Sequence, residues 1–532
     1  MKTPRPLQAA VILSVLYFCG RLTGLFQTSI INALLPAPAA DAYWAAFAIP
    51  DFVNYLVAGG ALSITFIPLY TELLHRDGDE AAAQFFSTLT TLMGGILILL
   101  VIVSELAAPW LVAIFRPGFI DKQDIFHLTV NMTRIILPAQ IFFYIGGLLV
   151  GVLNAHKRFA ASGWTGALYN TVAVAFGLFL WWRGDGPLAF AWGILLGALV
   201  GNYLLPLIAV VRGPKEQHPR FEFILQLKSP AVRKYFLNAL PIMIGVSLPV
   251  VDQVIVTWFA SFLPVGSLAH IVTANRVMIA PIGILGQAAS VAAFPYMADD
   301  TAAGDWLRFS SFIRRGLRRL MFLSIPLGIL LVLTAAPIIT LLFGYGVFEQ
   351  GNALAQTSAI FAFFCVGLFA WVGQAFIARA FYALKDTFTP TLLGSLLTIF
   401  VFIPICWLAT HFGGAWALAL VTSIGATLQF VILLWALDNR LSSPQYNAPL
   451  KSERIGGVIL RTITACIIMG IVGMIAAKVL FVILPHGKLG SILEIAGVWI
   501  AGIISFGVAA ERFDIPEWSW LLQKLRLRKV AR

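Results

Sequence analysis

Residues 83–104, AQFFSTLTTLMGGILILLVIVS, contain no charged side chain and are rich in Leu, Ile and Val. About 20 mostly apolar residues in an α-helix are enough to cross the hydrocarbon core of a bilayer. The rest of the chain is similar: of its 532 residues, 60% are hydrophobic and 11% are charged, and the mean hydropathy is +0.89. Soluble domains carry roughly 25% charged residues. The composition therefore excludes a water-soluble enzyme, a nucleic-acid-binding domain and a disordered chain.

Similar apolar segments recur along the whole chain, separated by charged or Gly/Pro-rich joints. The 14 segments are 7–35, 41–73, 83–115, 124–155, 161–182, 187–211, 234–262, 268–298, 309–343, 352–383, 389–410, 413–437, 456–484 and 489–510. They lack the alternation of a β-barrel strand. We expect the first segment to be retained as a span, because no small-residue cleavage site follows it. The pattern predicts an all-α polytopic membrane protein with about 14 transmembrane helices.

The basic residues support this map. When successive joints are assigned alternately to two sides of the membrane, 28 of the 36 Lys and Arg residues fall on one side and four on the other. The basic side of a membrane protein is the cytoplasmic side. The distribution therefore predicts a multi-pass protein of the cytoplasmic membrane with both termini in the cytoplasm.

Two short motifs recur at nearly the same offset. Phe66-Ile67-Pro68 and Phe294-Pro295 end the second and eighth segments, and Ala155-His156-Lys157 and Ala383-Leu384-Lys385 follow the fourth and tenth, at offsets of 227 and 228 residues. Chance similarity between apolar helices is the alternative explanation. The offset predicts two six-helix lobes, 1–228 and 229–440, related by a pseudo-two-fold axis along the membrane normal. The remaining parts would be two further helices in 441–510 and an amphipathic basic tail, 511–532, on an anionic leaflet.

Motifs of soluble catalysis are absent from the sequence. There is no P-loop, HExxH, GxSxG or dinucleotide-binding fingerprint. The four cysteines form no CxxC pair, and the seven histidines form no pair with metal-ligand spacing. We therefore expect no metal or organic cofactor and a transporter rather than an enzyme, although a membrane-embedded transferase stays open.

Ionisable residues inside apolar segments are the best candidates for function, because a charge in the bilayer is costly and needs a cavity or a partner. Arg21, Arg134 and Arg276 lie within such segments. Guanidinium groups at similar depths can bind a phosphate through paired hydrogen bonds. The alternative is structural pairing with Asp51 or Asp252, of which Asp252 is also a candidate ion site.

Three further features allow two interpretations each. Asp41 is either a gating residue or the N-cap of the second helix. The Gly59-Gly60 pair marks either a broken helix at a transport site or close packing. The glycines at 193, 197 and 201 are spaced by four residues, which is typical of a helix-packing seam.

Several motifs resemble those of the MurJ (MviN) lipid II flippases, a family of the multidrug/oligosaccharidyl-lipid/polysaccharide exporter superfamily. These motifs are Ala40–Tyr43, Ala46–Pro50, Gly60–Ser63, Phe66–Pro68, Leu153–Phe159, Ala260–Leu263, Asn275-Arg276 and Phe381–Pro390. The resemblance covers about residues 10–440. It implies two lobes around a cationic cavity that opens alternately to either side, with the last two helices forming a groove for an undecaprenyl tail.

The resemblance also assigns site residues. Arg21, Asp41 and Arg276 match family positions that are important for function. The sequence departs from the family at Gln27 and near Asn54, where arginines are usual, near Gly59, where a glutamate is usual, and at Asn275, where an acid is common. The resemblance also implies a sodium site on the seventh, eleventh and twelfth helices. Asp252 could contribute to it, but the eleventh segment, 389–410, offers no carboxylate in this chain.

The leading hypothesis is a flippase that moves an undecaprenyl-pyrophosphate-linked peptidoglycan precursor across the bacterial inner membrane. Arg21, Arg276 and Arg134 would bind the headgroup, with Gln27 and Asn54 as neutral hydrogen-bonding groups. The alternatives are export of another lipid-linked glycan or a drug, and a transport-inactive scaffold for cell-wall synthesis proteins. Coupling to the membrane potential or to a monovalent ion is compatible with each transport hypothesis.

Overall fold

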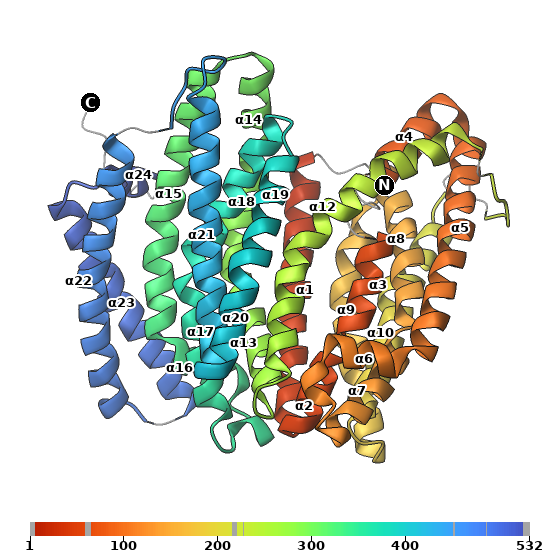
Figure 1. Ribbon diagram of the computed structural model, residues 1–532, viewed down its shortest axis with the longest axis horizontal. Coiled ribbons are helices and arrows are strands. Elements are labelled where there is room, and N and C mark those ends of the chain that lie inside the picture. The colour runs from red at the N-terminus through yellow and green to blue at the C-terminus, as the bar shows by residue number, and fades with distance from the viewer. Residues whose placement is uncertain are drawn as a thin grey trace. The chain divides into compact units, whose positions relative to one another are not determined.

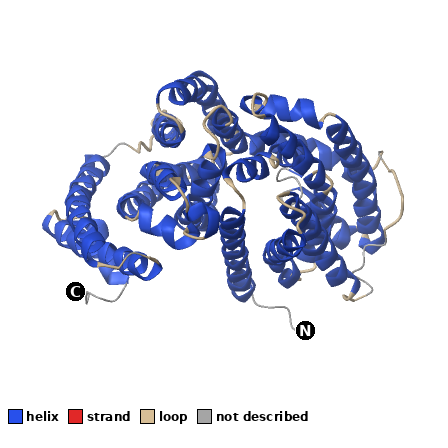
Figure 2. Cartoon of the chain, turned by 90° about the horizontal axis from the view of Figure 1, so that it is seen from below, coloured by secondary structure: helices blue, strands red, loops and turns tan. Residues whose placement is uncertain are grey.

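The computed structural model describes residues 6–58, 65–214, 221–226, 228–450, 453–485 and 487–524. Every regular element in these ranges is a helix (Figures 1 and 2). The chain divides into two compact units, Met1–Ala269 and His270–Arg532.

The first unit contains twelve complete α-helices among its described residues. They are α1 (Pro6–Leu34), α2 (Ala37–Ala45), α3 (Ala48–Ala58), α4 (Ile67–Arg76), α5 (Gly78–Leu106), α6 (Ala108–Phe115), α7 (Gln123–Ile136), α8 (Ala139–Ala155), α9 (Phe159–Arg183), α10 (Leu188–Gly197), α11 (Leu205–Val211) and α12 (Pro230–Ala260). The π-helical segment η3 (Ala198–Leu204) joins α10 to α11, and a 3₁₀ turn, η2 (Pro117–Phe119), follows α6. The core of this unit surrounds α5 and α8, where Leu89 and Leu148 are fully buried.

Helix α13 (Ser267–Ile282) begins at the boundary, and the rest of the second unit is again helical. Its other α-helices are α14 (Ala288–Ala302), α15 (Trp306–Leu333), α16 (Ala335–Phe343), α17 (Ala353–Val366), α18 (Leu368–Ala383), α19 (Phe388–Leu397), α20 (Ile403–Phe412), α21 (Ala415–Leu441), α22 (Glu453–Ile483), α23 (Lys488–Arg512) and α24 (Pro516–Lys524). The π-helical segments η5 (Gly283–Gln287) and η7 (Thr398–Phe402) interrupt two of the predicted spans. One core cluster joins Phe322 of α15, Met469 of α22 and Phe506 of α23.

The prediction of an all-α polytopic membrane protein is confirmed. Within the described residues, ten helices are long and apolar enough to cross a membrane, or eleven if the bent pair α17 and α18 counts as one span. The exact number of 14 stays a prediction, as do the lobe boundaries. Some predicted segments longer than 20 residues contain a break, such as the one between α5 and α6 at Ala107, whereas α1 and α22 are single unbroken helices of 29 and 31 residues.

The two copies of the Ala155 and Ala383 motif adopt the same backbone conformation. Lys157 and Lys385 have positive φ angles of 59° and 58°, which non-glycine residues rarely adopt. The amide that follows each lysine donates to a carbonyl five residues earlier, at 2.8 Å and 2.9 Å. This is the bond pattern that closes a helix through a left-handed residue. The same turn therefore ends α8 in the first unit and α18 in the second, whereas the symmetry relation between lobes stays a prediction.

The glycines spaced by four residues do form a packing seam. A Cβ atom at Gly197 would lie 2.7 Å from the carbonyl oxygen of Tyr169, and one at Gly201 would lie 2.5 Å from the amide nitrogen of the same residue. Gly193 approaches the carbonyl of Ala173 in the same way. Only glycine allows the backbones of α9 and the α10–η3 segment to come this close. The other glycine pair, Gly59-Gly60, lies outside the described residues.

Candidate functional site

The carboxylate of Asp41 binds the start of a helix that is distant in sequence. Its two oxygens accept hydrogen bonds from the amides of Gly266, at 2.6 Å, and Ala269, at 2.8 Å. Asp41 is only 1% exposed. The first amides of a helix have no partner within that helix, so an anion is favourable there. Asp41 therefore caps α13.

The expectation that Asp41 caps its own helix is wrong. Helix α2 begins at Ala37, and Pro36 occupies its N-cap without a side-chain hydrogen bond. Asp41 lies one turn inside α2, which directs its carboxylate to another part of the chain. Sequence spacing identified the right type of interaction but the wrong helix.

Lys122 holds the loop before α13 from a second direction. Its Nζ donates to the carbonyl oxygens of Ser261, at 3.0 Å, and Leu263, at 2.6 Å. The amide of Gly118 donates to Ser261 Oγ at 3.1 Å. Partial burial lowers the pKa of Lys122, and the charge of Asp41 opposes this effect. Residues 261–269 are thus fixed by an acidic and a basic side chain within the first unit, and we call this arrangement the double clamp.

Arg116 is a buried cation close to the double clamp in sequence. It is 3% exposed, its Nη1 donates to the carbonyl of Phe115 at 2.7 Å, and its Nε has no hydrogen-bond partner among the described residues. Burial lowers its pKa to about 9, and the charge of Asp51 acts in the opposite direction. Asp51 is exposed on α3. The charge interaction gives Asp51 a pairing role with a cation that was not among the three expected arginines, Arg21, Arg134 and Arg276.

The remaining predicted residues of the first unit lie at separate places. Arg21 is exposed and Gln27 is buried, both on α1. Asn54 Nδ2 donates to Gln140 Oε1 at 2.8 Å, which ties α3 to α8. Arg134 is exposed, and its Nε donates to the carbonyl of Glu105 at 3.2 Å.

The last two predicted residues, Asp252 and Arg276, are half-buried on α12 and α13, and neither is free of interactions. Arg276 belongs to the second unit, whereas Arg21 belongs to the first. A phosphate site formed jointly by the two arginines therefore stays a prediction.

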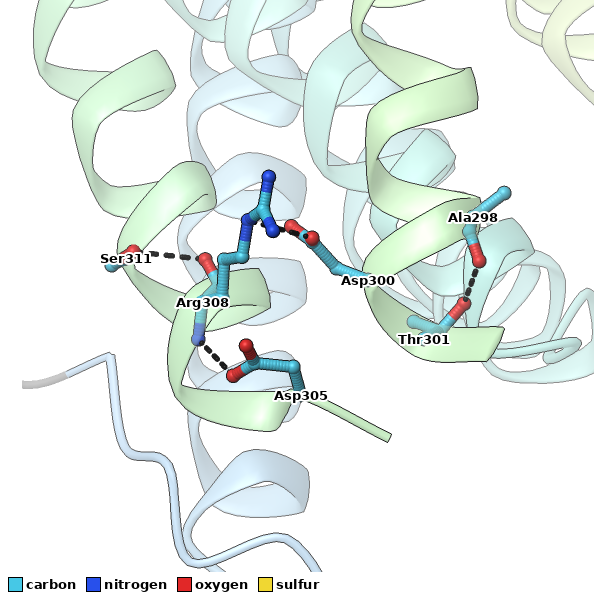
Figure 3. Close-up of polar contacts among 6 residues, drawn as sticks. All are labelled: Ala298, Asp300, Thr301, Asp305, Arg308 and Ser311. Atoms are coloured by element: carbon cyan, nitrogen blue, oxygen red, sulfur yellow. Dashed lines mark hydrogen bonds and ion pairs between the residues drawn. The ribbon is translucent and has the colours of Figure 1, made fainter. Parts of the chain in front are cut away.

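Ion pairs on the predicted cytoplasmic side were not anticipated. Asp300 of α14 pairs with Arg308 of α15 at 3.1 Å, and Asp305 caps α15 by accepting from the amide of Arg308 at 2.9 Å (Figure 3). Asp386 accepts hydrogen bonds from the amide and hydroxyl of Thr389 and pairs with Arg440. Burial opposes ionisation of Asp386, but these donors outweigh it and lower the pKa of the carboxyl group.

The C-terminal helix α24 is tied to α15. Glu517 pairs with Arg318 at 2.5 Å, and both side chains are largely buried. Arg319 lies 4.5 Å from the ring centroid of Trp520. The basic tail therefore begins with a helix that packs on protein, and its predicted contact with anionic lipid stays a prediction. Residues 525–532 lie outside the described residues.

Sequence reasoning also missed Glu494. This carboxylate is half-buried on α23, within the apolar segment 489–510. Arg21 and Arg276 were selected as ionisable residues inside apolar segments. Glu494 meets the same criterion, so the sequence could have identified it. The partners of Lys122 were not visible, because they lie about 140 residues away in sequence.

Sequence comparisons with known proteins all indicate the same protein family. The sequence model of the family described as "Lipid II flippase MurJ" matches residues 24–495. The chain is 28% identical over 441 residues to the lipid II flippase MurJ of Burkholderia cenocepacia, covering 81% of this chain and 84% of that protein. It is also 28% identical to the probable lipid II flippase MurJ of Rhizobium tropici, covering 68% of each chain.

Solved structures agree on the fold. A lipid II flippase MurJ in an inward closed conformation has a TM-score of 0.75 at 19% identity, covering 94% of this chain and 99% of that chain. An inward-facing MATE multidrug resistance transporter of the MOP superfamily has a TM-score of 0.64 at 14% identity, covering 82% and 98%. The structural likeness establishes the fold, and the family match extends over most of the sequence. The chain belongs to the MurJ family.

Proposed function

We propose that this chain is a lipid II flippase, a transporter that moves a polyprenyl-pyrophosphate-linked peptidoglycan precursor from the cytoplasmic to the outer leaflet of the bacterial inner membrane. The observation that carries the proposal is the family match over residues 24–495. The multi-pass helical architecture and the absence of catalytic motifs from the sequence are consistent with it. Both termini would lie in the cytoplasm.

Charge complementarity supports the assignment of binding residues. The pyrophosphate of the substrate carries negative charge, and arginine binds phosphate oxygens through paired donors. Arg21 and Arg276 would supply this charge, with Arg134 as a third candidate. Gln27 and Asn54 would donate uncharged hydrogen bonds, and the polyprenyl tail would remain in lipid beside the apolar helices α22 and α23.

The double clamp supports a role in alternating access. Asp41 and Lys122 bind residues 261–269, which the predicted topology assigns to the side of the membrane opposite the basic loops. With this loop held, the external entrance would stay closed while the headgroup enters from the cytoplasm. Release of the loop would then accompany exposure of the headgroup outside. The membrane potential or a monovalent ion would drive the cycle, and Asp252 is a candidate ion ligand.

Complementation tests the proposal directly. In a strain depleted of its own lipid II flippase, Arg21→Ala and Arg276→Ala should each abolish growth rescue while the protein still inserts in the membrane. Arg183→Ala is a matched control, because Arg183 is an exposed arginine at the end of α9 with no proposed role. Failure of the unaltered chain to rescue would reject the function, whereas full rescue by both variants would reject only the residue assignment.

A second candidate cargo, another lipid-linked glycan or a drug, is favoured by one observation. Gln27 and Asn54 are neutral where the family usually has arginines, so fewer charges would meet a pyrophosphate. A lipid II flipping assay in the same depleted cells separates the cargoes, because export of a different molecule leaves lipid II on the inner leaflet. A transport-inactive scaffold would also fail this assay, but it would retain binding to cell-wall synthesis proteins.

A further inference from the structure

The segment Phe221–Gln226, between α11 and α12, exposes an unusual row of apolar side chains. Phe221, Phe223 and Leu225 are 44%, 88% and 55% exposed. The segment is not helical, and the amide of Ile224 donates to the carbonyl of Glu222 at 2.7 Å, so the chain turns at Phe223. The rings of Phe221 and Phe223 lie 5.0 Å apart between centroids. These three side chains form one outward-facing ridge, which we call the Phe221–Leu225 ridge.

The backbone of this segment is fastened to α5. The amide of Glu222 donates to Ser87 Oγ at 3.1 Å, and Gln226 Nε2 donates to Gln84 Oε1 at 3.4 Å. The segment lies beside α5, at the edge of the first unit (Figure 1). Because its three side chains are exposed, the helices of the first unit do not cover the ridge.

The position of Ser87 gives the depth of the ridge. Helix α5 has 29 residues and is one of the candidate membrane spans. At about 1.5 Å per residue it is about 44 Å long, roughly 14 Å longer than the hydrocarbon core. Within α5, the uncharged run 85–104, between Gln84 and Glu105, has 20 residues and is about 30 Å long, which matches the thickness of the hydrocarbon core. Ser87 is two residues, about 3 Å, from the start of this run, so it lies near the boundary between headgroups and acyl chains.

The charged residues around the ridge are consistent with a position at the headgroup boundary. Arg212 precedes the segment, Lys228 and Arg233 follow it, and all three are exposed. They belong to the basic side of the predicted topology, where the leaflet is rich in anionic headgroups. Apolar side chains beside exposed cations are typical of a segment at a membrane interface.

We propose that residues 221–226 form a lipid anchor. Phe221, Phe223 and Leu225 insert into the headgroup boundary of the cytoplasmic leaflet, and Lys228 and Arg233 contact lipid phosphates. The anchor holds the connection between the predicted lobes at a fixed depth. This inference concerns the membrane surface and does not depend on which cargo is transported.

Site-directed spin labelling of the full-length protein in nanodiscs tests the anchor. In a cysteine-free background, a label at Phe223→Cys should collide several-fold more often with oxygen, which concentrates in lipid, than with a water-soluble nickel chelate. Asp77→Cys is the matched control: its side chain is also exposed, but it precedes α5 and lies eight residues, about 12 Å, outside the run 85–104, so its label should prefer the nickel chelate. Leu225→Cys should reproduce the result of Phe223→Cys if that variant fails to fold.

Two results would overturn the proposal. Equal nickel accessibility at positions 77 and 223 would place the ridge in water. Shielding of the label at position 223 from both reagents would mean that another protein surface, and not lipid, covers the ridge.

Discussion

Asp41→Ala would remove the carboxylate that holds the first residues of α13. In the unaltered protein, both carboxylate oxygens accept amide hydrogen bonds, at 2.6 Å and 2.8 Å, in a site that is 1% exposed to solvent. Alanine has no side-chain oxygen that could accept these hydrogen bonds. The amides of Gly266 and Ala269 would therefore be left without their partners.

The size of the effect follows from these two bonds. A hydrogen bond to a charged group contributes about 1.5–3 kcal/mol, and loss of an N-cap side chain costs about 0.5–2 kcal/mol. Water that enters near the exposed loop recovers part of this loss, so we expect about 3 kcal/mol for Asp41→Ala. Asp41→Asn keeps one acceptor oxygen but loses the charge, and we expect about 1.5 kcal/mol.

Hydrogen–deuterium exchange of the protein in nanodiscs measures this change locally. A loss of about 3 kcal/mol increases exchange of the Gly266 and Ala269 amides about 150-fold, because each 1.4 kcal/mol corresponds to a factor of ten. The corresponding increase for Asp41→Asn is about tenfold. The peptide that spans residues 261–272 reports both values.

Asp51→Asn is the control, because Asp51 is an exposed carboxylate ten residues further along the chain. It should leave exchange at Gly266 and Ala269 unchanged. If Asp41→Ala also leaves their exchange within about threefold of the unaltered protein, the two hydrogen bonds contribute less than about 0.7 kcal/mol. The capping role of Asp41, and its proposed part in the double clamp, would then be refuted.

Three further predictions concern other contacts. Gly197→Ala should lower stability by about 1–3 kcal/mol, measured as an earlier thermal transition, because its new methyl group meets the backbone of α9; Gly166→Ala, on an open face of α9, should have little effect, and equal effects would contradict the seam. A double-mutant cycle of Arg318→Ala and Glu517→Ala should give a coupling energy of about 1–3 kcal/mol, because the pair is largely buried, and additive losses would exclude a direct interaction. Burial lowers the pKa of Lys122, so the folded state binds fewer protons than the unfolded state as the pH rises toward 10.5. The unaltered protein should therefore gain stability relative to Lys122→Gln in that range, and identical pH profiles would contradict this.

The apolar segments predicted the helical architecture because a bilayer imposes a length and a composition on each span. The seam at Gly197 was predictable for a similar reason, since a spacing of four residues places glycines on one helix face. Arg21 and Arg276 were selected because a charge inside an apolar segment needs a cavity or a partner, and this criterion should also have selected Glu494.

Contacts between distant parts of the chain were not predictable in this way. Asp41 caps a helix that begins more than 220 residues later, and no local pattern specifies that partner. The clamp by Lys122 depends on two carbonyl oxygens, which every residue type provides. The helix breaks inside the spans likewise depend on how neighbouring helices pack.

The π-helical segments η3, η5 and η7 have a consequence for comparing this chain with its relatives. A π turn encloses one more residue per hydrogen-bonded ring than an α turn. Deleting one residue there restores a regular α-helix while the flanking turns keep their faces toward the same neighbours. In an alignment of related sequences, single-residue gaps should therefore collect at 198–204, 283–287 and 398–402, in the middle of apolar helices where gaps are otherwise rare.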